Sequence, residues 1–315
     1  MILLAPLQSF TDYHFRNAFS MHYTGIDGAV SPFISLLKGE KGKPRIARDV
    51  LPSNNRSIPV IPQILGNDAA LFIQMAEFLH RWGYEKINWN LGCPVRSITR
   101  KQRGSGLIPY PDLIREMLEK IIPNIPQSLS VKIRLGLNNT DEIYQLVPVL
   151  NDFPLENIIV HARIGAQMYE GNVQHDVLQK CLPLFRHEVI YNGDIFSYSD
   201  CIAIKNRYPE IKKWMIGRGV FYNPFLPSMI KGEQAPTKEK AKEMFLSFLL
   251  DLYSEFQNDN HLLRVENKIK MLWELFSKGF VNSDSVFDQI SHAPTMNDIV
   301  TITRKLVETE EMKNP

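Results

Sequence analysis

The stretch KINWNLGCP at residues 86–94 predicts a buried β-strand that ends in a loop carrying a thiol. The run Lys86–Trp89 is short and largely apolar, as is typical of a strand in a parallel sheet. Cys93 then stands between Gly92 and Pro94, which restrict the backbone on both sides. A free cysteine is most often a small buried hydrophobic residue, but one at the end of a buried strand is placed to face a substrate. Cys93 is therefore the first candidate site residue.

Similar apolar runs recur along the first three-quarters of the chain. Eight of them predict strands: Ile2–Ala5, Gly28–Val30, Val60–Leu65, Lys86–Asn90, Ser130–Arg134, Asn157–His161, Glu188–Tyr191 and Lys213–Ile216. Helical patterns lie between them, the clearest at residues 69–81, 112–122, 141–150, 177–184 and 199–207. Strands rich in Val and Ile that alternate with helices favour an α/β fold with parallel pairing, and eight such units predict a (β/α)8 TIM barrel. The alternative is a doubly wound open sheet, whose glycine-rich first turn is missing from Ala5–Gln8.

The pattern changes after Lys231. Residues 232–236, GEQAP, predict a linker, and apolar residues then recur at helical spacing from Phe245 to Leu306. We predict a catalytic barrel over residues 1–232 and a small all-helical domain of three or four helices over residues 237–315. Because so short a domain buries little surface by itself, we expect it to pack against the barrel.

Composition sets outer limits on location and ligands. The chain has 36 basic and 34 acidic residues among 315, a balance that neither requires nor excludes a nucleic-acid partner. Its three cysteines show no metal-ligand spacing, which predicts no metal site and a reducing, cytoplasmic location. No stretch approaches the roughly 18 apolar residues of a membrane span, and no protein partner is evident.

Polar residues recur where this fold places its chemistry. Active sites of TIM barrels lie at the C-terminal ends of the strands, and a single polar residue buried there without a partner costs a few kcal/mol. The recurrence therefore favours a shared polar ligand. The residues concerned are Pro6, Leu7 and Gln8, then Gln63, Asn90, Cys93, Lys132, His161, Arg163, Asn192, Gly193, Asp194, Gly217 and Arg218.

The last of these residues predict a phosphate site. Gly193 and Gly217 let backbone N–H groups approach an anion, and Arg218 adds a charge, at the two loops that usually hold phosphate in this fold. Lys132 could stabilise the anionic form of a flat ring, and Gln63 could bond to the ring edge. Together these features suggest flavin mononucleotide (FMN).

Each residue also has a purely structural interpretation. Lys132 could form a buried ion pair with Asp194, His161 could be a hydrogen-bonded core histidine, and Arg163 could cap a loop. Cys181 and Cys201 lie inside helical patterns and are expected to belong to the core.

In this order, the segments resemble those of the tRNA-dihydrouridine synthases, FMN-dependent enzymes, here of the bacterial type. The resemblance covers essentially the whole chain and is most specific at Asn-x-Gly-Cys-Pro. It departs from the family pattern at Leu7, where Met is usual, and at Ile164, where a hydroxyl residue commonly follows the Arg. The matching segments are Leu4–Pro6, Pro62–Gly66, Asn90–Pro94, Lys101–Leu107, Val131–Gly136, Val160–Arg163, Asn192–Asp194 and Ile216–Gly219.

The resemblance implies that FMN is bound by Pro6, Leu7, Gln8, Gln63, Lys132, His161, Arg163, Asn192, Gly193, Asp194, Gly217 and Arg218. It also implies NADPH as reductant, with NADH as the alternative. The flavin would deliver hydride to C6 of uracil while the thiol of Cys93, as general acid, protonates C5. Asn90 would hold the uracil edge after the base has left its stack.

Basic residues beside Cys93 and in the tail are expected to contact the backbone of transfer RNA. They are Arg96, Arg100, Lys101, Arg103, Arg264 and Lys268. For Lys38, Lys41 and Lys43, in an early loop, an ordinary solvated surface is an equally good interpretation.

Two other functions remain open. One is an FMN barrel that acts on a free pyrimidine, such as a dihydroorotate or dihydropyrimidine oxidoreductase. The other is an RNA-binding relative that has lost its chemistry. The helical tail and the basic run after Cys93 favour RNA over a free pyrimidine, and the presence of Cys93, Lys132 and Arg218 argues against lost activity.

Overall fold

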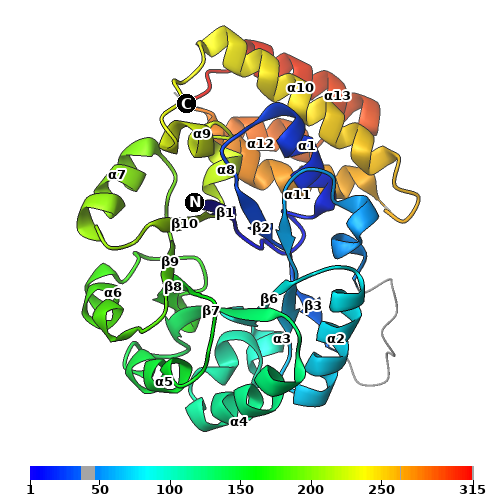
Figure 1. The fold of residues 1–315 in the computed structure, drawn as a ribbon. Coiled ribbons are helices and arrows are strands. Elements are labelled where there is room, and N and C mark those ends of the chain that lie inside the picture. Colours follow the sequence, from blue (N-terminus) through cyan, green and yellow to red (C-terminus); the bar gives the residue numbers. More distant parts are fainter. Residues whose placement is uncertain (37–46, 263, 314–315) are drawn as a thin grey trace.

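Ten short parallel strands curl into a ring in the computed structural model, which describes residues 1–36, 47–262 and 264–313 (Figure 1). Their order in the sheet is β3-β5-β6-β7-β8-β9-β10-β1-β2-β4. The strands are β1 Ile2–Leu4, β2 Gly28–Val30, β3 Ile34–Ser35, β4 Val60–Ile61, β5 Gln63–Leu65, β6 Lys86–Leu91, β7 Ser128–Gly136, β8 Ile158–Ile164, β9 Val189–Asn192 and β10 Lys213–Ile216.

The strand pairs at the two ends of this order are consecutive along the sequence, since β2 leads into β3 and β4 leads into β5. The ring therefore closes as an eightfold barrel. β2 pairs with β4 and β3 pairs with β5, while only residues 31–33 separate β2 from β3 and only Pro62 separates β4 from β5. Proline has no N–H to give to the ladder, which explains why the strand predicted over 60–65 is interrupted. Ser31 bridges the break, because its N–H donates to the Ile61 carbonyl at 3.0 Å and its Oγ accepts from the Gln63 N–H at 3.1 Å. The predicted TIM barrel is confirmed.

Helices surround the ring on its outside (Figure 1). They are α1 Tyr13–His22, α2 Ala69–Arg81, α3 Arg96–Thr99, α4 Pro111–Ile121, α5 Glu142–Asn151, α6 His175–Cys181, α7 Tyr198–Arg207, α8 Gly219–Tyr222 and α9 Leu226–Ile230. α2 has the predicted bounds. α6 ends at Cys181 and a 3₁₀ turn, Leu182–Leu184, follows it, because Pro183 cannot continue the α-helical hydrogen bonding.

The alternation of side chains along the strands separates two apolar regions. Leu3, Val30, Ile159, Ile190 and Met215 belong to a small cluster of their own, together with Ala5, and this cluster fills the inside of the barrel. Neighbouring residues of opposite orientation, such as those on either side of Leu3, join the larger core between strands and helices. The barrel is therefore packed, and a ligand site can lie only at one of its ends.

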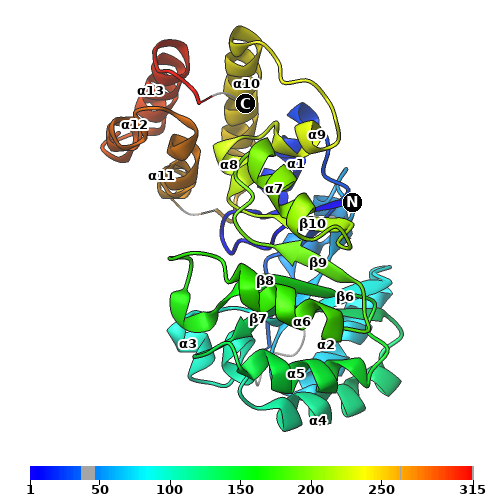
Figure 2. The same cartoon turned by 90° about the vertical axis from the view of Figure 1, so that its left-hand side faces the viewer.

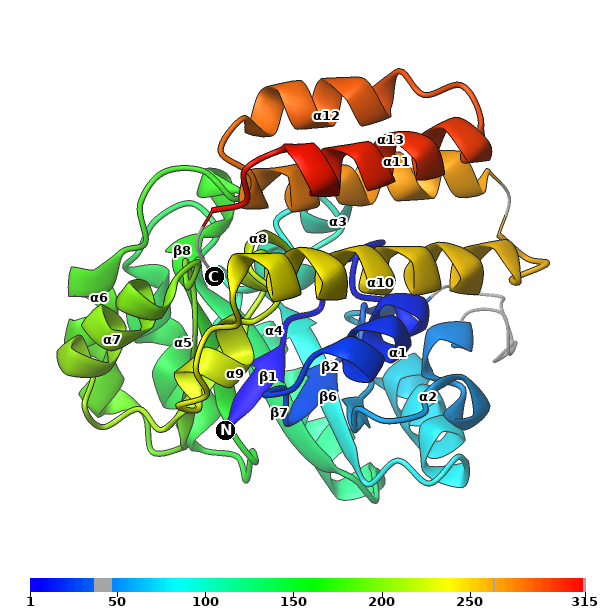
Figure 3. The same ribbon diagram turned by 90° about the horizontal axis from the view of Figure 1, so that it is seen from above.

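Four further helices follow residue 237 and lie over one side of the barrel (Figures 2 and 3). They are α10 Lys238–Gln257, α11 Val265–Phe276, α12 Ser283–Ser291 and α13 Met296–Thr309. Tyr253 joins three of them, because its hydroxyl lies 2.6 Å from Trp273 Nε1 and 3.1 Å from Thr303 Oγ1. Phe248 packs against Phe15 of α1, with ring centroids 5.9 Å apart, so these helices share the core of the barrel. None of the helices in the described part of the chain has the length and apolarity needed to cross a bilayer.

A buried carboxylate at the end of α10 fixes these helices to the barrel. Asp259, whose side chain is 3% exposed, accepts a hydrogen bond from Tyr13 at 3.0 Å and pairs with Arg48 and, at 3.1 Å, with His14. Removing one member of a buried ion pair leaves the other charge uncompensated.

We expect Asp259→Ala to lower the free energy of unfolding by about 2–4 kcal/mol, because it leaves Arg48 and His14 without their buried carboxylate partner. The matched control is Asp251→Ala, which breaks an ion pair with His22 on the surface and should cost less than about 1 kcal/mol. Urea denaturation of both variants measures the difference, and equal costs would show that the Asp259 cluster does not anchor the helices.

Candidate active site

A cavity of about 550 Å³ opens at the C-terminal ends of the barrel strands. Its walls come from the loops after β1, β2, β6, β8, β9 and β10, from β7 and from Leu275 of α11. This volume lies within the usual range of small-molecule sites, about 300–1,000 Å³. The C-terminal helices thus form part of the wall of a barrel cavity.

The loop after β6 holds Cys93 at the edge of this cavity. Asn90 Oδ1 accepts hydrogen bonds from the N–H groups of Gly92 and Cys93, at 3.0 and 2.9 Å. The Cys93 carbonyl in turn accepts from the N–H and the hydroxyl of Ser105, both at 3.0 Å. Gly104, with φ +56°, passes so close that a Cβ there would lie 2.6 Å from the Cys93 carbonyl oxygen. The segment RGSGL at residues 103–107 therefore packs directly against the loop that carries Cys93.

The surroundings of Cys93 keep its sulfur protonated. Burial raises the pKa of the Cys93 thiol, and this effect outweighs the opposing effects of the Val95 N–H, Arg134 and Lys132. Cys93 is a free thiol and is only partly buried. A raised pKa favours the thiol over the thiolate, as a proton donor would require.

Two cations follow one another on the same face of β7. Burial, with Arg134 nearby, lowers the pKa of Lys132 to about 7. Arg134 donates to the Gly92 carbonyl at 3.0 Å and the Ile164 carbonyl at 2.8 Å, and burial lowers its pKa to about 10. Lys132 pairs with no carboxylate in the described ranges. A partly buried cation without an anion is costly, so Lys132 is available to an electron-rich or anionic ligand.

Asp194 pairs with two arginines, Arg163 and Arg218. It does not pair with Lys132, the partner that the structural interpretation of Lys132 predicted. Arg163 binds Asp194 with both terminal nitrogens, at 2.9 and 2.5 Å, and Arg218 lies at 3.2 Å. These pairs hold the Asp194 backbone at φ +34°, next to Gly193, where a Cβ would lie 2.9 Å from Val173. The loop after β9 is therefore fixed in one conformation.

His161 is neutral in this setting. Burial and then the surrounding cations, Lys132 first, lower the pKa of His161 well below its ordinary value. Arg163 Nη1 lies 3.2 Å from its Nε2. Because a guanidinium can only donate, Nε2 must accept and the ring proton is on Nδ1.

Most residues predicted to bind the cofactor face this cavity, but two do not. The side chains of Gln63 and Arg163 are buried, and neither belongs to the lining of the cavity. Gln63 is bonded to Asn88 and Asn90, and Arg163 is bonded to Asp194 and His161, while their direct contact with a cofactor stays a prediction. The predicted residues that line the cavity are Pro6, Leu7, Gln8, Asn90, Cys93, Lys132, His161, Asn192, Gly193, Asp194, Gly217 and Arg218.

The residues predicted to contact RNA fall into two groups. Arg96, Arg100, Lys101 and Arg264 are exposed, and Arg103 donates to Asn67 Oδ1 at 3.1 Å. The ammonium of Lys268 is held by the Ser9 carbonyl and, at 2.7 Å, by Asp12. Lys268 therefore joins α11 to the loop after β1, and its contact with RNA stays a prediction. Lys38, Lys41 and Lys43 lie outside the described residues.

Sequence analysis did not name every residue of the cavity wall, and three of those it missed add contacts that matter for the site. Arg134 stands two positions after Lys132 on one strand, and this spacing placed it on the same face. Tyr169 lies in an irregular loop, 5.2 Å from Arg134 and 5.9 Å from Arg218, measured from the ring centroid to each guanidinium carbon. Leu275 comes from α11, which no barrel pattern could have brought to this site.

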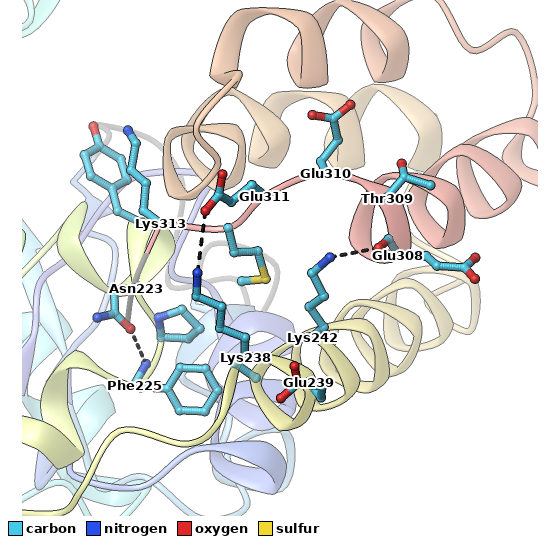
Figure 4. Close-up of a pocket in the computed structure, with 14 residues that line it drawn as sticks. Asn223, Phe225, Lys238, Glu239, Lys242, Glu308, Thr309, Glu310, Glu311 and Lys313 are labelled. Atoms are coloured by element: carbon cyan, nitrogen blue, oxygen red, sulfur yellow. Dashed lines mark hydrogen bonds and ion pairs between the residues drawn. The ribbon is translucent and has the colours of Figure 1, made fainter.

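A second cavity, of about 410 Å³, lies where the C-terminal tail passes the start of α10 (Figure 4). Two of its lysines bond within the pocket wall: Lys238 lies 3.5 Å from Glu311, and Lys242 donates to the Glu308 carbonyl at 2.8 Å. These contacts hold the tail in place, and we assign the chemistry to the barrel cavity. Nowhere in the described ranges do three or more His, Cys, Asp or Glu side chains gather as they would around a metal ion.

Comparisons with known proteins agree with the barrel assignment. A family model described as dihydrouridine synthase matches residues 3–306. The tRNA-dihydrouridine(16) synthase of Neisseria meningitidis serogroup B is 27% identical, over 99% of this chain and 96% of the relative. The tRNA-dihydrouridine synthase B of Pasteurella multocida is 28% identical, over 71% of this chain and 67% of the relative. Among solved structures, a morphinone reductase mutant in complex with tetrahydroNAD has a similar fold, with a TM-score of 0.50 and 9% identity over 73% of this chain and 86% of that one.

Proposed function

The chain belongs to the dihydrouridine synthase family, and we propose that it reduces the C5–C6 double bond of specific uridines in transfer RNA to give 5,6-dihydrouridine. The observation that supports this most directly is the meeting of Cys93 and Lys132 in one cavity at the mouth of the barrel. One group can donate a proton and the other can stabilise negative charge on a ring. A free pyrimidine as substrate would leave the exposed basic run after Cys93 without a role.

We propose FMN as the cofactor, because the residues of the cavity fit it. Lys132 has no anionic partner among the described residues, and Gly193 can have no side chain where the loop meets Val173. Arg218, at the next loop, is partly exposed and can add a hydrogen bond to a phosphate. Lys132 would lie against the ring, and the Gly193 and Arg218 loops would hold the phosphate.

When bound, the flavin would supply the hydride that adds to C6 of the uracil ring. The chain itself performs the other steps. Asn90 Oδ1 and Ser105 hold the Cys93 main chain in place, and the protonated thiol donates its proton to C5. Arg134 and Tyr169 form part of the cavity wall that Cys93 shares.

We propose that NADPH, with NADH as the alternative, reduces the flavin. We also propose that the exposed Arg96, Arg100, Lys101 and Arg264 contact the RNA backbone. The C-terminal helices, over residues 237–315, would carry part of that RNA surface. Because the three cysteines are free thiols, we place the reaction in the cytoplasm.

The test begins with the colour of the purified protein, which should show flavin absorbance. The protein is then incubated with NADPH and unmodified transfer RNA, and dihydrouridine is measured by mass spectrometry of the digested RNA. We expect dihydrouridine in the RNA and little reduction of free uridine or of orotate. Equal rates on free uridine would favour a free-pyrimidine oxidoreductase, and a colourless protein that binds RNA would favour a relative without chemistry.

A further inference from the structure

A continuous chain of buried polar side chains runs through the barrel behind the cavity. Ser130, Asn88 and Gln63 lie side by side on β7, β6 and β5, because Asn88 is in register with both of the others. Asn90 stands two residues further along β6, on the same face. Successive members are 2.8, 2.7 and 2.7 Å apart, and their exposed fractions are 3% or less for the first three and 6% for Asn90.

Main-chain N–H groups fix the direction of every hydrogen bond in this series of side chains. The N–H groups of Gly92 and Cys93 can only donate, so Asn90 Oδ1 accepts and Asn90 Nδ2 must donate to Gln63 Oε1. The amide of Gln63 then donates to Asn88 Oδ1, and Asn88 Nδ2 donates to Ser130 Oγ.

At the far end, the Ser130 hydroxyl donates to the Ile87 carbonyl at 3.2 Å. No amide in this chain can flip without losing bonds on both sides. Hydrogen bonds that all point the same way polarise one another, so each strengthens the next.

We propose that Asn88 and Ser130 are positioning residues for Cys93. Neither side chain lines the cavity, so neither can touch a ligand there. They act by fixing the amides of Gln63 and Asn90, and Asn90 Oδ1 then holds the N–H of Cys93. The inference rests on the proposed role of Cys93 as proton donor, because a displaced thiol would protonate C5 poorly. A 1 Å displacement can cost about 10²-fold in rate.

The test compares Ser130→Ala, which removes the last hydroxyl of the hydrogen-bonded series, with Ser130→Thr, which keeps that hydroxyl. Ser228→Ala is the matched control, because it removes another buried serine hydroxyl, bonded to the Phe225 carbonyl at 3.0 Å and distant in the fold. The first measurement is the alkylation rate of Cys93 by iodoacetamide as a function of pH, without flavin or RNA. Peptide mapping distinguishes Cys93 from the buried Cys181 and Cys201.

We expect Ser130→Ala to change the alkylation rate by at least threefold and to shift its pH midpoint, with the other two variants unchanged. For uridine reduction by Ser130→Ala, we expect kcat to be about tenfold lower and KM to be unchanged. The reason is that a misplaced Cys93 thiol affects the transition state and not substrate binding. If Ser130→Ala does not fold, Ser130→Cys keeps the shape of the side chain but accepts hydrogen bonds weakly, and the same comparison applies.

Wild-type alkylation in Ser130→Ala or Ser130→Cys would overturn the positioning role, even if the enzyme reduces uridine. Altered alkylation together with a wild-type protein that reduces no uridine would instead overturn the proposed function and leave the positioning role standing.

Discussion

Replacing Cys93 by Ala should lower the rate of uridine reduction by about 10²- to 10⁴-fold, the usual contribution of a general acid. The thiol lies at the cavity edge, and burial raises its pKa, which favours the protonated form that can donate. Reduction of the flavin by NADPH should be unchanged, because that step needs no proton from Cys93. Stopped-flow measurement of the two half-reactions separates these outcomes.

The controls for this prediction use the remaining thiols and the hydroxyl analogue. Cys93→Ser keeps the shape of the side chain, but an alcohol is a far weaker acid, so its rate should be nearly as low. Cys181→Ala removes a thiol buried in the core at the end of α6 and should leave both half-reactions unchanged. Equal activity of Cys93→Ala and the wild-type protein would show that the proton comes from another source.

The pH dependence of the same step follows from the direction of the pKa shift. Burial raises the pKa of Cys93, and an acid donates only while it is protonated. The uridine-reduction rate should therefore be constant up to about pH 8.5, the ordinary pKa of a thiol, and should fall only above it. A rate that rises between pH 7 and 9 would indicate a thiolate nucleophile instead.

The fold could be predicted from the sequence because its signals are local. Val- and Ile-rich runs and the helices between them repeat eight times, and the bounds of α2 and β10 were found directly. The interruption at Pro62 was readable in principle, since proline cannot continue a ladder. The packing of α11 on the barrel mouth depends on contacts between residues far apart in sequence, such as Lys268 with Asp12, and no local pattern reports them.

The candidate site was predictable only in its outline. Strand-end position brought Lys132 and Asn192 to the cavity, but it could not distinguish side chains that face the cavity from those that are fully buried beneath it. Gln63 and Arg163 lie beneath it, because buried amides and guanidinium groups must satisfy their hydrogen bonds and here find protein partners. The identity of those partners, Asn90 and Asp194, depends on strand register and loop geometry.

Lys132→Met should make the flavin-free protein at least as stable as the wild type and should weaken FMN binding by about 10- to 100-fold, as expected for losing one charged hydrogen bond. The stability gain follows because Lys132 is a cation without an anionic partner among the described residues, and burial lowers its pKa to about 7. The binding loss follows because an electron-rich ring or phosphate would supply the missing partner. Fluorescence titration of the flavin-free protein with FMN measures the affinity.

The lowered pKa of Lys132 also fixes the direction in which the stability of the flavin-free protein changes with pH. The unfolded chain holds a proton on this lysine up to about pH 10.4, whereas the folded protein releases it near pH 7, so the unfolded state binds more protons between these values. Wild-type stability should therefore rise from pH 7 to pH 10 more steeply than that of Lys132→Met, as urea denaturation at several pH values would show. Lys120→Met, an exposed change of the same charge, is the matched control. If Lys132→Met instead binds FMN as tightly as the wild type, the cation does not face the flavin, and the ring must lie elsewhere in the cavity.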